Sequence, residues 1–389
     1  MSVVAPAGFV AGGIACGIKP SGAPDLALVA TADGRPVPAA GVFTRNLVVA
    51  APVVVSRRHL AATGGRAAAV VLSSGNANAG TGARGESDAE RMCALTAAGL
   101  GAAPEGVLVC STGLIGYELP MDAVGAGIPA VVAARGGDAA HGAAAAEAIM
   151  TTDTRRKEAV VRGEGFVVGG LAKGAAMLAP DMATMLAVLT TDAAVEPGPL
   201  HAALAAGVAD SFNAMTVDGC TSTNDTVILL ASGRAGRPDP GAFAAAVAAA
   251  CEDLATQMVG DAEGHTKVVE VRVTGARSAA DARRAARQVA ESQLVKCSWF
   301  GCDPYWGRVA SELGTAGVAL DPGALTIAYG GTVVSRACVG VDHDAGAVAA
   351  HMAGEHLELT CDLGVGSAAG RVLTNDLTYG YIDENRGTS

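Results

Sequence analysis

The sequence has 389 residues, of which half are apolar and only 3% are aromatic. Its 38 acidic residues outnumber its 27 basic ones, so the net charge is −11. An acidic chain that lacks a basic block, or a basic face carrying aromatic side chains, is not typical of a nucleic-acid-binding protein. The length permits two ordinary domains or one large one with a sizeable core.

The chain begins MSVVAPAGFVAGG, with neither a basic segment nor a long apolar stretch, so we expect no signal peptide. No run reaches the roughly 18 apolar residues of a membrane span. The nine cysteines form no CxxC pair, and this scattered, odd set indicates reduced, buried thiols. The seven histidines are isolated, so we expect no metal site. These features predict a soluble, cytoplasmic protein.

In the first half of the chain, short strand-like runs alternate with Ala-rich helical stretches. Residues 67–80 and 105–116 are predicted to be buried strands that end in glycine-containing turns. Residues 86–100 have the spacing of an amphipathic helix with acidic residues in its first turn. Residues 141–154 predict a helix that runs into a polar Thr-Thr-Asp-Thr turn, and residues 165–179 predict paired strands with glycine turns.

The second half repeats this alternation. Residues 240–264 predict a long helix with Pro at its first position and Gly after its last. Residues 268–276 form an alternating strand, residues 278–297 a helix with a basic outer face, and residues 326–340 a strand pair. Residues 233–240 are the best loop candidate. The alternation of strands and helices predicts an α/β fold, of the layered α+β kind.

An apolar segment near the middle of the chain, KGAAMLAPDMATMLAVLTTDA, contains a Pro-Asp pair and then Ala183 and Thr184. One interpretation is a buried strand that begins after a turn, with Thr184 as an ordinary strand hydroxyl. The other is self-cleavage, in which the Thr184 hydroxyl attacks the Ala183 carbonyl and shifts the peptide to an ester. Hydrolysis then leaves Thr184 with an α-amine that titrates at about pH 7.7–8.0 and can act as base for its own hydroxyl.

Nine segments around this motif resemble, in the same order, the ornithine acetyltransferases (glutamate N-acetyltransferases) of arginine biosynthesis. They are AGGIACGIKPSGAPDLAL, GVFTRN, SGNANAGTG, CSTGLIG, IMTTDT, DGCTSTNDTV, DAEGHTK, LVKCSWFGCDPYWGRV and NDLTYGYIDEN. The resemblance implies two α/β domains whose sheets are sandwiched by helices. It also implies cleavage into residues 1–183 and residues 184–389, which stay associated, contribute together to both domains and form a dimer of the two-chain unit.

The activity implied by the resemblance is transfer of acetyl from N2-acetyl-L-ornithine to L-glutamate through an acyl-enzyme on Thr184, in a ping-pong cycle. No metal or tightly held cofactor is implied, and whether acetyl-CoA also serves as acetyl donor stays open. Three alternatives remain. They are a relative of secondary metabolism with an altered acyl donor, a self-cleaving aminopeptidase relative, and a non-catalytic protein that binds acyl-amino acids.

The resemblance also implies roles for individual residues. Thr112 and the backbone N–H of Gly113 would form the oxyanion hole, in which one donor is worth about 3–4 kcal/mol of barrier. The implied substrate contacts are Thr151, Lys173, Thr184, Glu263, Asn385 and Ser389. A lysine in the apolar stretch around position 173 needs a partner, which a substrate carboxylate can supply. Taken alone, CSTGLIG is a strand-exit turn and Glu263 a surface acid near a helix end.

Three departures from the family pattern stand out. Ala176 replaces a customary Gly in KGAAM, which would cost about 1 kcal/mol if that position needs a positive φ. Tyr305 and Gly80 replace a customary Asn and Cys, and neither position carries an implied catalytic role. The tail ENRGTS is shorter than the family's and lacks its Tyr, which weakens the case for Ser389 as a substrate contact.

Overall fold

The computed structural model describes residues 2–177 and 185–387. The chain divides into two compact units. Unit 1 comprises Met1–Asn213 and Cys220–Met258, and unit 2 comprises Ala214–Gly219 and Val259–Ser389. Unit 1 therefore draws on both sides of the predicted cleavage point. Unit 2 draws only on residues after it, so the expectation that both cleavage products contribute to both domains is wrong for unit 2.

Unit 1 contains two sheets that share one apolar core. The first has the strand order β1-β2-β5-β6 and the second β4-β3-β10-β9-β8-β7. The strands are β1 (Phe9–Ile14), β2 (Leu26–Thr31), β3 (Val37–Phe43), β4 (Arg66–Ala67), β5 (Ala69–Asn76), β6 (Val107–Leu114), β7 (Lys157–Gly163), β8 (Phe166–Lys173), β9 (Leu186–Ala193) and β10 (Thr226–Gly236). Val29 and Leu72 of the first sheet belong to the same buried cluster as Val188 and Ile228 of the second. The two sheets therefore pack face to face.

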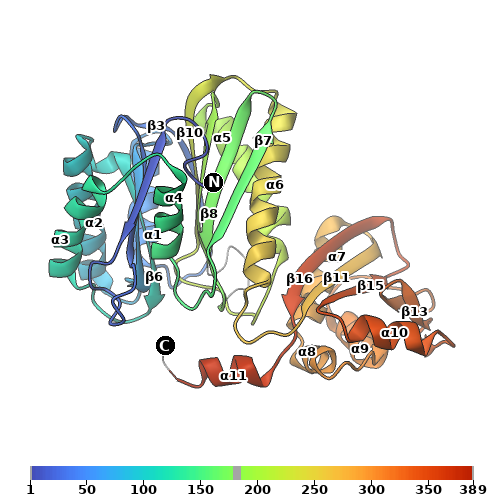
Figure 1. Cartoon of the computed structure of the whole chain (residues 1–389). Coiled ribbons are helices and arrows are strands. Elements are labelled where there is room, and N and C mark those ends of the chain that lie inside the picture. Colours follow the sequence, from blue (N-terminus) through green and yellow to red (C-terminus); the bar gives the residue numbers. More distant parts are fainter. Residues whose placement is uncertain (1, 178–184, 388–389) are drawn as a thin grey trace. The chain divides into compact units, whose positions relative to one another are not determined.

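Helices cover the outer faces of both sheets (Figure 1). In unit 1 they are α1 (Ala51–Ala62), α2 (Gly82–Leu100), α3 (Met121–Ala133), α5 (Pro197–Asp210) and α6 (Pro240–Val259). A further helix, α4 (Ala139–Ala148), packs on the opposite face of the first sheet from α3 and contributes Ala145 and Ala148 to the core between the sheets. Leu28 and Val71 of the first sheet pack with Met92 of α2 and Ile128 of α3. On the second sheet, Leu254 of α6 packs beside β8. The resulting helix–sheet–sheet–helix order confirms the predicted sandwich.

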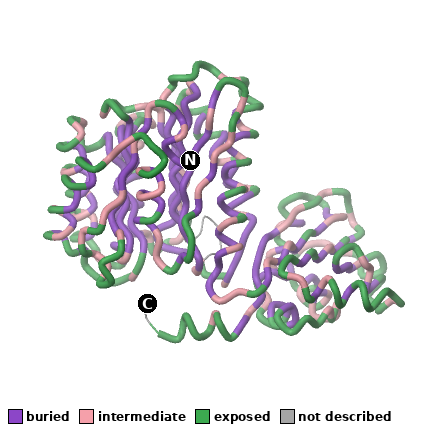
Figure 2. Tube along the Cα trace, in the orientation of Figure 1, coloured by how far each residue is buried: buried purple, intermediate pink, exposed green. Residues whose placement is uncertain are grey.

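Unit 2 is built on one sheet with the order β14-β13-β12-β15-β11-β16. Its strands are β11 (Val268–Ala276), β12 (Thr326–Tyr329), β13 (Thr332–Arg336), β14 (Val339–Gly340), β15 (His356–Asp362) and β16 (Ala368–Asn375). Its helices are α7 (Ala279–Glu291), α8 (Gln293–Phe300), α9 (Trp306–Thr315), α10 (Ala345–Met352) and α11 (Tyr379–Asn385). Val271, Ile327 and Leu359 form its core with Trp299 of α8. In both units the strands are mainly buried and the outer helix surfaces exposed (Figure 2).

Several element predictions need correction. The helix predicted over residues 278–297 breaks at Ser292, whose side chain caps α8 by accepting the N–H of Val295. The strand pair predicted over residues 165–179 is wrong for its described part, residues 165–177, because β8 there is a single strand that pairs with β7 and β9. Four cysteines are exposed rather than buried; they are Cys220, Cys297, Cys302 and Cys338.

Two elements of the second half also differ from their predicted bounds. β10 continues to Gly236, into the predicted loop, and α6 ends at Val259 rather than near residue 264. By length and composition α6 could span a membrane, contrary to the sequence expectation, and half of its most apolar window is buried inside the protein. Val247, Cys251 and Leu254 are fully buried. The apolar length of α6 is thus accounted for by its role as a core helix of unit 1.

Small residues let α4 approach the first sheet closely. A Cβ on Gly13 of β1 would lie 2.0 Å from the carbonyl oxygen of Ala144 in α4. We expect Gly13→Ala to lower the free energy of unfolding by about 1–3 kcal/mol, because the helix backbone must move. The measurement is urea unfolding followed by circular dichroism.

The matched control is Gly198→Ala. Gly198 lies in α5, and a Cβ added there would have no atom within 4 Å among the described residues. Alanine is the better helix former, so we expect this variant to be as stable as the wild type or slightly more stable. Equal unfolding free energies for both variants would contradict the close approach of α4 to β1.

Candidate active site

Three strands of the second sheet bring their ends together at one edge. β8 and β9 are antiparallel and pair Lys173 with Leu186, while β9 and β10 are parallel and pair Leu186 with Thr226. The end of β8 therefore lies beside the beginnings of β9 and β10. Met185 precedes β9 and directly follows Thr184 in the sequence. In the sequence, the Ala183–Thr184 peptide bond therefore comes one residue before Met185, the described residue from which the chain enters the sheet at this edge.

Three of the residues predicted for the site fall outside the described part of the chain. They are Ala183, Thr184 and Ser389. The remaining predicted residues are described, and they form two groups. Thr112, Gly113, Thr151 and Lys173 are in unit 1, and Glu263 and Asn385 are in unit 2.

Lys173 brings the unit 1 group together. Its side chain is 3% exposed, and its Nζ donates to Thr151 Oγ1 at 2.7 Å and to Thr112 Oγ1 at 3.4 Å. An ammonium group buried to this degree needs polar partners, and the two hydroxyl groups provide them. The structure thus brings residues far apart in the sequence into one polar cluster, which we call the Lys173 cluster: Thr112, Thr151, Asp153 and Lys173.

Asp153 anchors this cluster and was missed by the sequence analysis. Its Oδ1 accepts from Lys157 Nζ at 2.6 Å and from the Gly174 N–H at 2.7 Å, and its Oδ2 accepts from the Thr151 N–H at 3.0 Å. Lys173 Nζ lies 3.9 Å from Oδ2. Burial acts to raise the pKa of Asp153, but the charges of Lys173 and Lys157 outweigh it and lower the pKa to about 2. An Asp within the predicted polar turn, followed by Lys157 in the sequence, was the available signal.

The segment predicted as an oxyanion-hole turn lies within strand β6 rather than after it, because Ser111, Thr112 and Gly113 all pair with β5. Its backbone is one that only glycine fits. Gly113 has a φ of +129°, and a Cβ there would lie 2.3 Å from the carbonyl carbon of Gly75 on the neighbouring strand β5. Asn224 secures the strand end, because its side-chain amide donates to Ser111 O at 2.9 Å and to Ala77 O at 2.6 Å. Thr112 and Gly113 therefore sit on a firmly held strand end beside Lys173.

Asp225, also missed by the sequence analysis, holds the start of β9. Its Oδ1 accepts the Met185 N–H at 2.8 Å, whereas Oδ2 has no hydrogen-bond partner among the described residues. The carboxyl is fully buried, and burial raises its pKa well above the ordinary value for Asp. A neutral carboxyl can occupy this position at far lower cost than a charged one. The amide that follows Thr184 is therefore fixed by a buried acid.

In unit 2, the predicted residues Glu263 and Asn385 are in direct contact. Asn385 Nδ2 donates to Glu263 Oε2 at 2.7 Å and to Tyr381 O at 2.9 Å. Glu263 also lines a cavity of about 160 Å³ together with Lys296. Burial lowers the pKa of Lys296 to about 8, although the nearby Asp218, Asp376 and Glu291 act to raise it. This cavity of unit 2 is therefore lined by side chains of both charge signs.

Ala176 does not carry the strain that its replacement of Gly suggested. The residue with positive φ in this segment is Met177, at +53°, and Ala176 is not among the described residues with positive φ. The cost of about 1 kcal/mol considered for Ala176 therefore does not apply.

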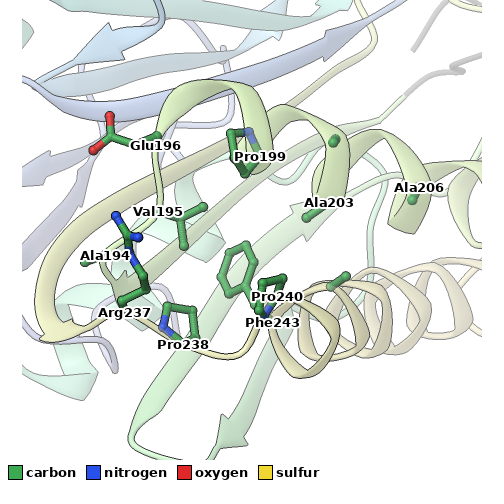
Figure 3. Close-up of a pocket in the computed structure, with 12 residues that line it drawn as sticks. Ala194, Val195, Glu196, Pro199, Ala203, Ala206, Arg237, Pro238, Pro240 and Phe243 are labelled. Carbon is green, nitrogen blue, oxygen red and sulfur yellow. The ribbon is translucent and has the colours of Figure 1, made fainter.

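A second cavity, of about 540 Å³, lies in unit 1 at the end of β9 that is farther from Met185 (Figure 3). Ala194 and Val195 line it directly after the strand ends, and the eight residues of β9 separate it from Met185 by roughly 25 Å. Its lining is mainly Ala and Pro with Phe243, and its charged residues are Glu196 and Arg237. None of the described residues that line it carries a hydroxyl or a thiol. This lining and the distance along β9 show that the cavity is separate from the Lys173 cluster.

The described ranges contain no candidate metal centre. Within residues 2–177 and 185–387, no three His, Cys, Asp or Glu side chains gather as a metal site requires.

Comparison with known proteins shows which family the chain resembles in sequence. The sequence model of the ArgJ family matches residues 10–387. The arginine biosynthesis bifunctional protein ArgJ of Mycobacterium leprae is 49% identical over 395 residues, covering all of this chain and 95% of that protein. The ArgJ protein of Thermobifida fusca is 46% identical over 391 residues and both chains are fully covered.

Two solved structures are also similar. The arginine biosynthesis bifunctional protein from Bacillus halodurans is 36% identical, with a TM-score of 0.49, and covers 51% of this chain and 96% of its own. The ornithine acetyltransferase of Mycobacterium tuberculosis complexed with ornithine is 44% identical, with a TM-score of 0.42, and covers 46% of this chain and 94% of its own.

The layered α/β fold and the buried Lys and Thr cluster at a strand edge, in a chain whose relatives are identical at nearly half of all positions, are those of an acyltransferase. The family match extends over almost the whole sequence. The chain belongs to the ArgJ family of arginine biosynthesis.

The charge balance of the Lys173 cluster makes a testable contribution to stability. Asp153 has a pKa of about 2 in the folded protein and an ordinary value of 3.8. Because the folded value is depressed, the stabilisation is complete above about pH 4 and is lost as the pH falls towards 2. Its size is on the order of 2 kcal/mol.

We expect Asp153→Asn to destabilise the protein by about 3–5 kcal/mol at pH 7, because Lys157 and Lys173 lose a buried partner. The variant should also lose stability less steeply between pH 4 and pH 2. Urea unfolding at a series of pH values measures both effects. The control is Asp122→Asn, in which the altered side chain is exposed in the first turn of α3. An Asp153→Asn variant with wild-type stability and pH dependence would contradict the assignment of Asp153 as anchor.

Proposed function

We propose that the protein is an autoprocessed acetyltransferase that moves acetyl from N2-acetyl-L-ornithine to L-glutamate in arginine biosynthesis. The observation that supports this most strongly is the position of the Lys173 cluster, in an ArgJ family chain, at the edge where the residues after Thr184 enter the sheet. Both proposed substrates carry carboxylates, which Lys173 can bind. Small molecules are thus the partners of the site.

The first step is a cut between Ala183 and Thr184. The Thr184 hydroxyl attacks the Ala183 carbonyl carbon, and its proton moves to the departing amide nitrogen, which leaves an ester. Water then hydrolyses the ester, placing a carboxylate on Ala183 and restoring the Thr184 hydroxyl next to a free α-amine. The products are an alpha chain of residues 1–183 and a beta chain of residues 184–389. An N-terminal amine of ordinary pKa is partly neutral at pH 7 and can serve as base.

Acetyl transfer then follows in two halves. Thr184 Oγ attacks the acetyl carbonyl carbon while the Thr184 α-amine takes the hydroxyl proton. The bond from that carbon to the α-nitrogen of ornithine then breaks, the nitrogen takes the proton, ornithine leaves, and an acetyl ester remains on Thr184. The glutamate α-amine attacks that ester, and N-acetylglutamate leaves while Thr184 regains its proton. Thr112 and the Gly113 N–H stabilise the oxyanion in both halves. Since Lys173 donates to Thr112 Oγ1, the Thr112 hydroxyl proton is free to be donated to the oxyanion.

Further residues bind the substrates in this proposal. Thr151 and Lys173 hold the substrate carboxylate. Glu263 and Asn385 act on the substrate ammonium, and their mutual hydrogen bond of 2.7 Å supports a shared role. Ser389 is a further contact by the family pattern alone.

No metal or tightly held cofactor takes part in the proposed cycle, and acetyl-CoA is a possible second acetyl donor. The two cleavage products stay together and assemble into a dimer of the two-chain unit. The proposed location is the cytoplasm, where the soluble enzymes of amino-acid synthesis act.

The cleavage is tested by the intact mass of the denatured protein. We expect two species that meet at the Ala183–Thr184 bond and whose masses sum to the full chain plus one water. Thr184→Ala should remain a single chain, because the attacking hydroxyl is absent. An uncut wild-type protein would favour the non-catalytic binding alternative.

Acetyl transfer is tested with N-acetylornithine and acetyl-CoA as separate donors and glutamate as acceptor. Product from the first donor supports the proposal, and product from both adds the second activity. Hydrolysis of peptide amides that exceeds acetyl transfer would favour the aminopeptidase alternative. Transfer with neither donor would oppose the assignment to arginine biosynthesis.

The oxyanion role is tested by Thr112→Val. We expect kcat to fall by about 100- to 1000-fold, with a smaller change in KM, since the hydroxyl acts on charge that develops in the transition state. Thr152→Val is the control, because Thr152 is exposed and is not part of the Lys173 cluster. A Thr112→Val effect confined to KM would reassign Thr112 to ground-state binding.

A further inference from the structure

A third lysine lies beside the Lys173 cluster and has no role in the proposed cycle. Lys19 Nζ donates to Pro24 O at 2.6 Å and to Met150 O at 2.7 Å. Met150 directly precedes Thr151, whose hydroxyl accepts from Lys173. Lys19 and Lys173 therefore approach the same short segment of chain, one through its backbone and the other through a side chain.

The loop that carries Lys19 is held in place by one buried acid. Asp25 is fully buried and accepts the backbone N–H groups of four successive residues, at distances between 2.6 and 3.1 Å. They are Cys16, Gly17, Ile18 and Lys19. Burial alone would raise the pKa of Asp25, but these hydrogen bonds outweigh it and lower the pKa. A backbone fixed at four amides presents the Lys19 side chain from a rigid base.

The Lys19 stem packs over the strands that carry the proposed oxyanion turn. A Cβ on Gly75 would lie 2.9 Å from Lys19 Cγ, so the stem rests directly on the Gly75 backbone. Gly75 of β5 pairs in register with Gly113 of β6. Lys19 therefore contacts Gly75, and Gly75 pairs with Gly113, whose N–H is the proposed oxyanion donor.

Lys19 forms no ion pair within the described part of the chain. The lysine is half-buried, and no carboxylate there lies within 4 Å of its Nζ as an ion-pair partner. Asp25 is committed to backbone amides, and Asp153 to Lys157 and the cluster. Burial lowers the pKa of Lys19, and the positive charge of Lys173 lowers it further, while Asp25, Asp153 and Glu147 oppose this. Two neighbouring ammonium groups in a partly desolvated place favour a bound anion.

We propose that Lys19 binds a carboxylate of the substrate and acts with Lys173 as a second cationic contact of the site. The inference rests on the proposed function, because that function supplies the ligands. N-acetylornithine carries one carboxylate and glutamate carries two, so the carboxylate group is the shared chemistry. Lys19 is then a specificity-determining residue that rejects neutral analogues of either substrate.

The experiment compares Lys19→Met and Lys19→Arg with the wild type, using each substrate and its neutral analogue. The analogues are the carboxamide of N-acetylornithine for the donor and glutamine for the acceptor. We expect Lys19→Met to raise KM for a carboxylate substrate by about 10- to 100-fold, with kcat changed much less. Arginine should restore part of the affinity, because it keeps the charge.

The analogues separate direct contact from a structural effect. If Lys19 binds the donor carboxylate, Lys19→Met and the wild type should use the carboxamide equally well. If it binds the side-chain carboxylate of the acceptor, the wild-type preference for glutamate over glutamine should disappear in the variant. An equal loss with charged and neutral forms of both substrates would overturn the proposal.

Arg135→Met is the matched control, because Arg135 of unit 1 also donates to a main-chain carbonyl, that of Val132, and has no contact with the Lys173 cluster. We expect its KM values to equal those of the wild type. A wild-type enzyme that transfers acetyl normally, together with Lys19→Met kinetics unchanged for all substrates, would overturn the Lys19 inference alone. A wild-type enzyme that neither transfers acetyl nor binds the substrates in calorimetry would sink the proposed function and this inference with it.

Discussion

The interleaving of strands in the second sheet of unit 1 is the constraint on which the rest of the site depends. Its order, β4-β3-β10-β9-β8-β7, places β9 and β10 between two pairs of strands that precede Thr184 in the sequence. All eight residues of β9 are buried. Separating the residues before and after Thr184 would break the ladders of β3 with β10 and of β8 with β9 and expose this core. A cut in the segment between β8 and β9 would therefore leave the sheet intact, because hydrogen bonds between neighbouring strands and the buried core hold it together without that covalent link.

The same interleaving explains why the buried charges gather where they do. Lys173 ends β8 and Asp225 precedes β10, so the strand register brings both to the edge at which Met185 precedes β9. Asp153 adds one carboxylate between Lys173 and Lys157, which leaves the group with a net positive charge. A buried cluster of this kind costs free energy unless each ion has partners, and here backbone amides and hydroxyl groups provide most of them. The surplus positive charge is the property that suits a site for carboxylate-bearing molecules.

Sequence reasoning reached the parts of this arrangement that depend on local pattern. The strands now seen as β5 and β6 and the helix α2 follow from apolar periodicity and glycine turns. Thr112, Thr151 and Lys173 came from resemblance to a family, and the structure brings these three together. The split between α7 and α8 was missed because the Ser292 cap competes with an otherwise continuous helical pattern.

Residues whose importance comes from contacts distant in sequence could not be predicted in this way. Asp225 binds an amide 40 positions earlier, and Lys19 reaches a carbonyl 131 positions later. An Asp that follows Thr and Asn, or a Lys that precedes Pro, has the same composition as an ordinary loop, so only the pairing of strands converts such positions into parts of a site.

Close packing of backbone links these contacts to the unusual composition. The chain has 52 glycines and few aromatic residues. Two of the glycines show what this composition permits, because Gly75 lies against both the Lys19 stem and Gly113. A side chain on Gly113 would collide with β5, and one on Gly75 would displace the Lys19 stem. Two glycines in register therefore allow a lysine stem, a strand pair and an amide donor to occupy a space that larger residues would fill. Bulkier side chains at these two positions would push β5 and the Lys19 stem away from the proposed oxyanion donors, so close approach is achieved here at the expense of side-chain packing within the strands.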